Sequence, residues 1–143
     1  MRELYRSVFC LLTIDEERAI IRRVRTSQRF ETIEVAKLAY DGVLQAVEGL
    51  DLARYGLLSD VREAPARNDP AFEQLLTHYY PRMFGSYRRM AVLVRTEAGR
   101  LHVARLSRLH ARPIEVFSDE RLALTYLEVR DDEDRPLRRP ARR

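Results

Sequence analysis

Histidine and cysteine are the side chains best suited to metal binding or nucleophilic catalysis, and this 143-residue chain has three histidines and one cysteine. His102 and His110 are eight residues apart, so on one helix they would lie about 12 Å apart along the axis. That separation is too large for one metal ion, and no cysteine accompanies them. Cys10 falls in an apolar run, where cysteine usually serves as a small buried hydrophobe. We therefore expect no metal site and no catalytic cysteine.

The acidic and glycine residues offer no catalytic pattern either. The acidic runs 15–17 and 119–120 fall at a predicted turn and a predicted helix start, where carboxylates have ordinary structural roles. The five glycines are scattered, and none has the spacing of a phosphate-binding loop. We expect no catalytic residues, no cofactor and no enzymatic activity.

Segment 78–89 is the one concentration of residues that favours binding. It interleaves four of the twelve aromatic residues with three arginines and one methionine, and interfaces are enriched in aromatics, arginine and methionine. Three interpretations remain open, namely core packing, a partner or ligand surface, and a stacking platform for nucleic acid. The residues predicted to contact a partner are Arg67, Tyr79, Arg82, Met83 and Tyr87, with Tyr79, Arg82 and Met83 the best candidates for exposure.

The distribution of charge disfavours nucleic acid. The net charge is +4, but the last eight residues contain four arginines and no acid, which leaves 22 basic and 22 acidic residues in 1–135. A folded nucleic-acid reader is expected to concentrate positive charge on the domain itself. The longest apolar runs are five residues, so we expect no membrane span. A single cysteine and the absence of a signal-peptide pattern indicate a cytoplasmic protein.

The predicted elements alternate after an opening hairpin. Residues 5–14 and 19–26 form the hairpin, and residues 30–50 have the three-and-four spacing of an amphipathic helix, with Thr32 or Ser27 near its start. Further strands are predicted at 55–61, 90–96 and 114–117. A helix is predicted at 70–80, with 70–84 as the alternative extent and a kink or stop at Pro81. Further helices are predicted at 100–110 and 118–130.

This order, ββαβαβαβα, predicts an α/β fold, because helices between parallel strands cross over on the faces of a sheet. We expect one domain over residues 1–130, with a mixed sheet of about five strands and helices packed on it. Residues 131–143 contain a single leucine among charges and prolines, so we expect a disordered tail.

The order of elements and three local patterns resemble the STAS-like family, the bacterial domains related to anti-sigma-factor antagonists, including relatives of the lipid-transfer-like kind. The patterns are the opening hairpin, the helix followed by Tyr-Gly-Leu-Leu-Ser-Asp-Val at 55–61, and the strand-to-helix step at 114–123. The resemblance covers residues 3–129. It implies a bacterial regulatory or signalling module that binds a partner protein, or alternatively a binder or sensor of a small apolar ligand or lipid.

The family resemblance also points to a phosphorylation position, the loop between the third predicted strand and the second predicted helix. Anti-sigma antagonists have a phosphorylatable serine there. In this sequence the loop, residues 61–70, contains no serine or threonine, and Ser59 precedes it inside the predicted strand. We therefore expect a module without the phosphoserine switch. The sequence does not indicate its oligomeric state.

Overall fold

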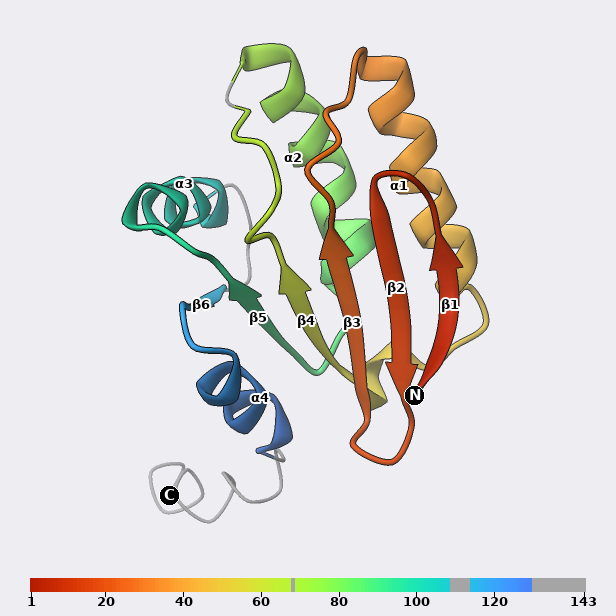
Figure 1. Cartoon of the computed structure of the whole chain (residues 1–143). Helices are drawn as coiled ribbons and strands as arrows, with labels where there is room; N and C mark the ends of the chain where they lie inside the picture. The colour runs from red at the N-terminus through yellow and green to blue at the C-terminus, as the bar shows by residue number, and fades with distance from the viewer. Residues whose placement is uncertain (68, 109–113, 130–143) are drawn as a thin grey trace, which may run out of the picture.

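One six-stranded sheet organises the protein, in a computed structural model that describes residues 1–67, 69–108 and 114–129 (Figure 1). The strands lie in chain order across the sheet. The first two pairings are antiparallel and the other three are parallel. The strands are β1 (Arg2–Arg6), β2 (Cys10–Asp15), β3 (Ile20–Arg25), β4 (Gly56–Asp60), β5 (Arg89–Leu93) and β6 (Glu115–Phe117). The predicted α/β fold with a mixed sheet is confirmed, with six strands instead of about five.

The additional strand comes from the N-terminal segment, which was predicted as one strand over residues 5–14. The chain instead turns at Ser7, whose hydroxyl accepts hydrogen bonds from the backbone N–H groups of Phe9 and Cys10. This serine turn separates β1 from β2, and the two strands then pair antiparallel. The alternating apolar pattern continues through both strands, so the pattern alone did not show the break. The predicted hairpin is confirmed as β2 and β3.

Two helices begin at side chains that cap them, and the first cap is one of the two expected from the sequence. Helix α1 (Ile33–Val47) starts at Thr32, whose hydroxyl accepts from the N–H of Val35 at 3.1 Å. Helix α2 (Pro70–Phe84) starts at Asp69, whose carboxylate accepts from the N–H of Phe72. The expected stop at Pro81 is wrong and the longer predicted extent is confirmed, because α2 continues for three residues beyond Pro81 and ends at Phe84. Proline removes only its own N–H, and the N–H of Gly85 still donates to the carbonyl of Pro81.

The helices cover both faces of the sheet. On one face, α1 and α2 bury the largest hydrophobic cluster, which includes Leu12, Ile21 and Leu57. On the opposite face, α4 (Glu120–Glu128) packs Ala123 and Leu127 against alternate residues of β3, β4 and β5. Helix α3 (Glu97–Ser107) stands apart at the β6 side of the sheet (Figure 1), where Val103 packs on Val92. A short 3-10 helix, Leu52–Arg54, leads into β4.

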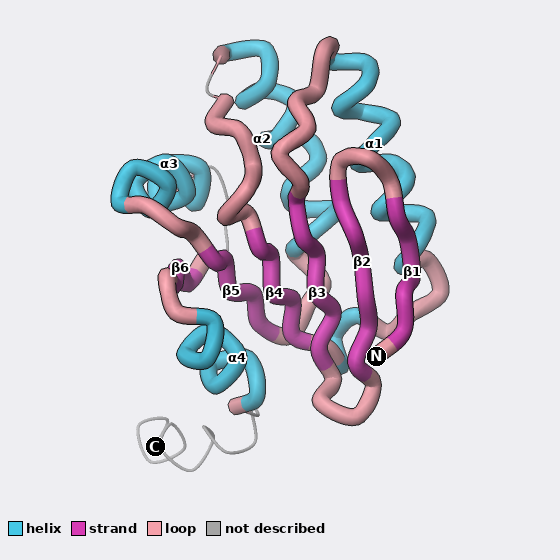
Figure 2. The backbone as a smooth tube through the Cα atoms, in the orientation of Figure 1, coloured by secondary structure: helices cyan, strands magenta, loops and turns pink. Residues whose placement is uncertain are grey.

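The carboxyl ends of β3, β4 and β5 meet at one edge of the sheet, because the three strands are parallel. Figure 2 shows the loops that leave these ends at the top of the sheet toward α1, α2 and α3. Ligands of open α/β sheets bind outside the carboxyl ends of the strands. The space between this edge, α2 and α3 is therefore the expected place for a ligand site.

Candidate functional site

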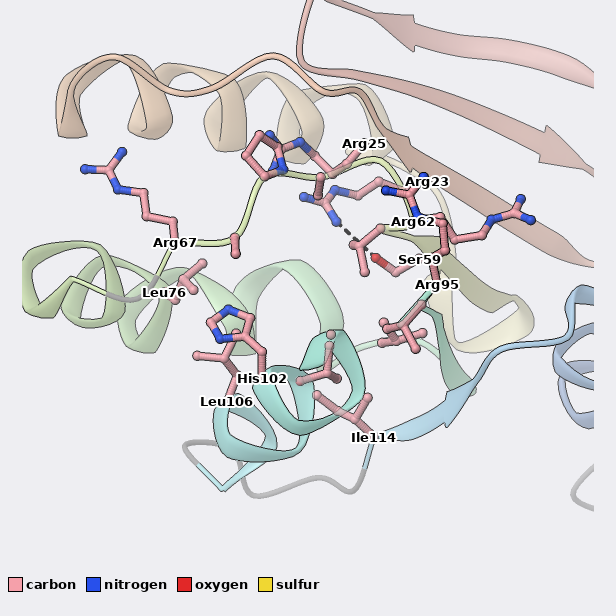
Figure 3. Close-up of a pocket in the computed structure, with 18 of the residues that line it drawn as sticks. Arg23, Arg25, Ser59, Arg62, Arg67, Leu76, Arg95, His102, Leu106 and Ile114 are labelled. Carbon is pink, nitrogen blue, oxygen red and sulfur yellow. Dashed lines mark hydrogen bonds between the residues drawn. The ribbon is translucent and has the colours of Figure 1, made fainter. Parts of the chain in front are cut away.

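A cavity of about 270 Å³ lies between the sheet, α2 and α3 (Figure 3). Strands β3, β4 and β5 contribute one wall and the two helices contribute the others, while the loop after β4 runs along it. The volume is slightly below the range of about 300–1,000 Å³ typical of small-molecule sites. Of the described residues that line it, five are arginines and none is aspartate or glutamate.

Two of these arginines lie deep, on β3. Side chains alternate between the faces of a strand, so Ile21, Arg23 and Arg25 point to the face covered by α1 and α2. Because α1 and α2 cover this face, Arg23 and Arg25 are only 6% and 8% exposed. The sequence Ile-Ile-Arg-Arg-Val-Arg thus places two guanidinium groups where an ordinary strand would place apolar side chains.

The hydrogen-bond donors of the Arg23 guanidinium are only partly satisfied. Its Nη1 donates to the hydroxyl of Ser59 on β4 at 3.0 Å, as Figure 3 shows, and its guanidinium lies 5.7 Å from the ring centre of Phe84. Its Nε is buried and has no hydrogen-bond partner among the described residues. An unmade hydrogen bond on a buried charged group is costly, so this nitrogen is an unusual feature of the wall.

Arg25 is held by backbone carbonyls. Its Nε donates to Phe9 at 3.0 Å and its Nη2 donates to Gln28 at 3.1 Å, while its guanidinium lies 4.5 Å from the ring centre of Phe30. Burial, followed by the charge of Arg23, lowers the pKa of Arg25 to about 10. The group therefore remains protonated at neutral pH, beside a second positive charge.

The helix walls of the cavity are mainly apolar. Helix α2 contributes Phe72, Leu76 and Phe84, and α3 contributes Val103 and Leu106. His102 also lines the cavity. Burial and then the charge of Arg105 lower its pKa, so it adds little charge at neutral pH. Burial raises the pKa of the Tyr80 hydroxyl, which stays neutral.

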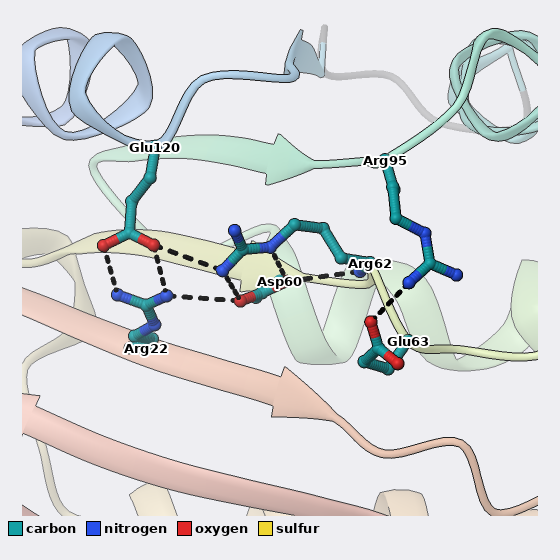
Figure 4. A network of polar contacts seen from close by, with 6 residues as sticks. All are labelled: Arg22, Asp60, Arg62, Glu63, Arg95 and Glu120. Atoms are coloured by element: carbon teal, nitrogen blue, oxygen red, sulfur yellow. Dashed lines mark hydrogen bonds and ion pairs between the residues drawn. The ribbon is translucent and has the colours of Figure 1, made fainter.

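The other three arginines that line the cavity each have a carboxylate partner. Arg67 pairs with Asp69 at 2.7 Å, and Arg95 pairs with Glu63 at 2.6 Å. Arg62 pairs with Asp60 at 2.8 Å and with Glu120 at 3.2 Å. Figure 4 shows the last two of these arginines within their networks. The deep arginines of β3 therefore differ from the outer ones in having no acidic partner among the described residues.

A polar network joins β3, β4 and α4 on the opposite face of the sheet (Figure 4). Arg22 contacts Glu120 at 2.9 Å and Asp60 at 3.2 Å, and Arg62 contacts the same two carboxylates. Burial alone would raise the pKa of Asp60, but hydrogen bonds from Arg62 and Arg22 outweigh it and lower the pKa. The hydrogen bond from Arg22 lowers the pKa of Glu120. These paired charges attach the start of α4 to the sheet.

Three of the five residues predicted to contact a partner lie in the core. Tyr79, Met83 and Tyr87 are each less than 5% exposed. The expected exposure of Tyr79 and Met83 is wrong because α2 packs on α1 as well as on the sheet. The ring of Tyr79 lies 5.4 Å from that of Tyr40, and its hydroxyl donates to Asp41 at 2.7 Å.

The two predicted partner arginines lie apart. Arg82 is exposed on α2, with its guanidinium 5.2 Å from the ring centre of Tyr79. Arg67 is half-buried beside the cavity, and its Nη1 donates to the carbonyl of Phe30 at 3.0 Å. The aromatic and arginine segment therefore serves the core more than the surface, and partner contact through Arg67 and Arg82 stays a prediction.

The structure also locates the remaining candidate side chains. Ser59 is buried on β4 with 2% exposure, as predicted, and Cys10 is buried on β2. In the described ranges, no group of three histidine, cysteine or acidic residues is placed to hold a metal ion. Nor does any helix within those ranges have the length and apolar character needed to cross a membrane. His110 and the predicted tail, residues 131–143, lie outside the described residues.

The sequence interpretation missed the arginines on β3. The available signal was the position of Arg23 and Arg25, two residues apart in a strand that could have been recognised as covered on both sides. Ser59 was expected inside its strand and not as a phosphorylation site, and the sequence alone does not indicate its hydrogen bond to Arg23. Recognising the site required the neighbour relation of β3 and β4, which sets Arg23 beside Ser59 in the parallel register.

Comparison with known proteins supports the fold. No family model matches the sequence, and no curated protein sequence matches it. The structure is similar to the crystal structure of an uncharacterized protein of the DUF3478 family from Shewanella loihica PV-4, which has a SpoIIAA-like fold. The TM-score is 0.55, the identity is 17%, and the match covers 83% of this chain and 94% of that chain. The expected STAS-like fold is confirmed, and this likeness concerns the fold alone.

Proposed function

We propose that the protein is a non-catalytic bacterial binding or sensing module of the cytoplasm that takes a small, largely apolar ligand. The cavity between the sheet, α2 and α3 is the observation that supports this proposal. Its apolar walls belong to two separate helices, and its position at the carboxyl ends of parallel strands is typical of ligand sites in α/β folds.

The chemistry of the cavity wall favours binding over catalysis. Its described polar groups are guanidinium groups, hydroxyls and the single imidazole of His102. General acid and base work commonly relies on a carboxylate or a histidine with a pKa matched to the reaction. No carboxylate is among the described lining residues, and the pKa of His102 is lowered by burial.

A regulatory role through a partner protein is the second proposal. The burial of Tyr79, Met83 and Tyr87 removes most of the predicted contact surface, which leaves Arg67 and Arg82. A ligand between α2 and α3 would contact α2, which presents Arg82, and would lie beside Arg67 in the loop that precedes this helix. The two proposals are therefore compatible, with ligand occupancy as the input and partner contact as the output.

Native mass spectrometry tests the ligand proposal. Protein purified under native conditions from the cells that produce it should show a mass above that of the polypeptide, and the excess should vanish on denaturation. Val103→Phe should abolish the excess, because Val103 is 9% exposed and lines the cavity. The larger ring also costs about 1–3 kcal/mol through overpacking, so folding is checked by circular dichroism.

Leu101→Phe is the matched control, since Leu101 lies on the same helix but is 64% exposed. This variant should retain the additional mass. A wild-type mass equal to that of the polypeptide, or an excess that persists in Val103→Phe, would count against a ligand in this cavity.

A further inference from the structure

The five arginines of the cavity fall into two classes. Arg62, Arg67 and Arg95 are neutralised by carboxylates, whereas Arg23 and Arg25 have no acidic partner among the described residues. Ion pairs compensate the positive charges of the three outer arginines. The two inner arginines are more deeply buried, and no described carboxylate compensates their charges.

Burial of an uncompensated charge is unfavourable, so a stable fold usually pairs such a group or removes it. Here Arg23 and Arg25 are neighbours on one face of β3, and each also raises the electrostatic energy of the other. Hydrogen bonds to Ser59, Phe9 and Gln28 satisfy part of their donors. The buried Nε of Arg23 remains without a partner within the described part of the chain.

We infer that the cavity binds an amphipathic ligand with one anionic headgroup, which Arg23 receives with Arg25 alongside, and an aliphatic chain that lies against α2 and α3. This inference rests on the proposed function and defines its ligand class. Carboxylates and phosphates share the chemistry that guanidinium recognises, since both accept its hydrogen bonds and neutralise its charge.

The arrangement of polar and apolar groups matches such a ligand. Arg23 and Ser59 lie on the sheet side of the cavity, whereas Leu76, Leu106 and Ile114 lie across it (Figure 3). The positive charge that has no acidic partner among the described residues is thus on the sheet wall, and apolar side chains face it. A neutral apolar ligand would leave both deep guanidinium groups without a counter-charge, and a small inorganic anion would leave the apolar walls unfilled.

The test measures binding of three probes with chains of equal length, namely decanoate, decyl phosphate and decanol. Isothermal titration calorimetry uses the full chain, shown by native mass spectrometry to be free of bound ligand. At least one anionic probe should bind at least tenfold more tightly than decanol, as a charge-assisted hydrogen bond implies. The tighter of the two anions identifies the headgroup.

Substitutions of Arg23 test whether this residue causes the preference for anionic probes. Arg23→Met should remove the preference for the anion while leaving decanol binding within about threefold of wild type, and Arg23→Lys should restore part of it. Arg82→Gln, an exposed arginine outside the cavity, is the control and should behave as wild type. Arg23→Met should also melt no lower than wild type, because the unpaired buried charge is removed.

The possible failures are distinguishable. Equal affinity for decanol and both anions would overturn the inference and leave the proposed function standing, and so would a preference that persists in Arg23→Met. Failure of all three probes to bind would overturn the proposed function together with the inference. The wild-type comparison of headgroups requires no variant, so it decides the matter even if Arg23→Met does not fold.

Discussion

At the scale of single residues, the same side-chain type takes different roles according to the surface that covers it. Arg82 and Arg23 are both arginines near aromatic rings, yet Arg82 is exposed and Arg23 is 6% exposed. Tyr79 lies between α1 and α2 and is anchored by its hydrogen bond to Asp41. The packing of the helices therefore sets which of these side chains are buried. Substitutions of the buried ones should change stability more than substitutions of the exposed one.

Tyr79→Ala should destabilise the protein by about 3–5 kcal/mol, the range for removing a large buried aromatic side chain. Tyr79→Phe should cost only about 1 kcal/mol, because it deletes the hydrogen bond to Asp41 and keeps the ring. Urea denaturation at pH 7 measures both. Arg82→Ala is the control and should change stability by less than about 1 kcal/mol. Similar effects at the two positions would show that Tyr79 is not a core residue.

At the scale of elements, α4 is attached to the sheet in two ways. Ala123 and Leu127 pack on it fully buried, and Glu120 connects to Arg22 and Arg62 at the carboxyl end of the sheet. At the other end of the helix, Arg88 donates to the carbonyls of Leu127 and Val129, which occupies acceptors that a helix end leaves open. The charged attachment makes this element sensitive to pH.

Stability should fall as the pH is lowered into the acid range. The pKa values of Asp60 and Glu120 are lower in the folded protein than their ordinary values of 3.8 and 4.5. A carboxyl group of this kind stabilises the fold above its unfolded pKa, and the contribution is lost as the pH falls through its folded pKa. Urea midpoints measured from pH 7 to pH 3 should therefore decrease, most steeply below about pH 4.5.

Glu120→Gln separates this network from the other carboxylates. At pH 7 the free energy of unfolding of this variant should be about 0.2–1 kcal/mol lower than that of wild type, which is the value of a partly exposed ion pair. The stability of the variant should also vary less with pH than that of wild type. A variant with the full wild-type pH dependence would exclude Glu120 from the acid-sensitive attachment.

At the scale of the whole molecule, the described residues from β1 to α4 form one sheet with helices on both faces. Within the part of the chain that the structure describes, the last core residue is Leu127 on α4. Residues 131–143 consist of four acids, five arginines, two prolines, one leucine and one alanine, a composition with almost nothing to bury.

Removal of residues 131–143 should therefore change the melting temperature by less than about 2 °C, measured by circular dichroism. A second truncation that ends at residue 118 is the contrasting control. It removes Ala123 and Leu127, both 0% exposed, and should not fold stably. A decrease of several degrees in the first truncation would place a stabilising contact within residues 131–143.

The class of fold can be predicted from the sequence alone, because hydrophobic period and helix capping are local properties. The spacing in α1, the cap at Thr32 and the Asp-Pro start of α2 are readable from a few consecutive residues. The buried position of Ser59 followed from its apolar strand. Conversely, the Ser7 turn that separates β1 from β2 was hidden by an alternating pattern that continues through it.

The residues that form the candidate site, in contrast, are brought together by contacts between distant parts of the chain. Burial of Tyr79 and Met83 depends on α1 lying beside α2, a contact between segments far apart in the chain. The placement of Arg23 beside Ser59 depends on the parallel register of β3 and β4, and the cavity depends on α3 standing across from α2. Side-chain exposure and charge pairing are properties of neighbours in space, and the order of residues along the chain does not specify those neighbours directly.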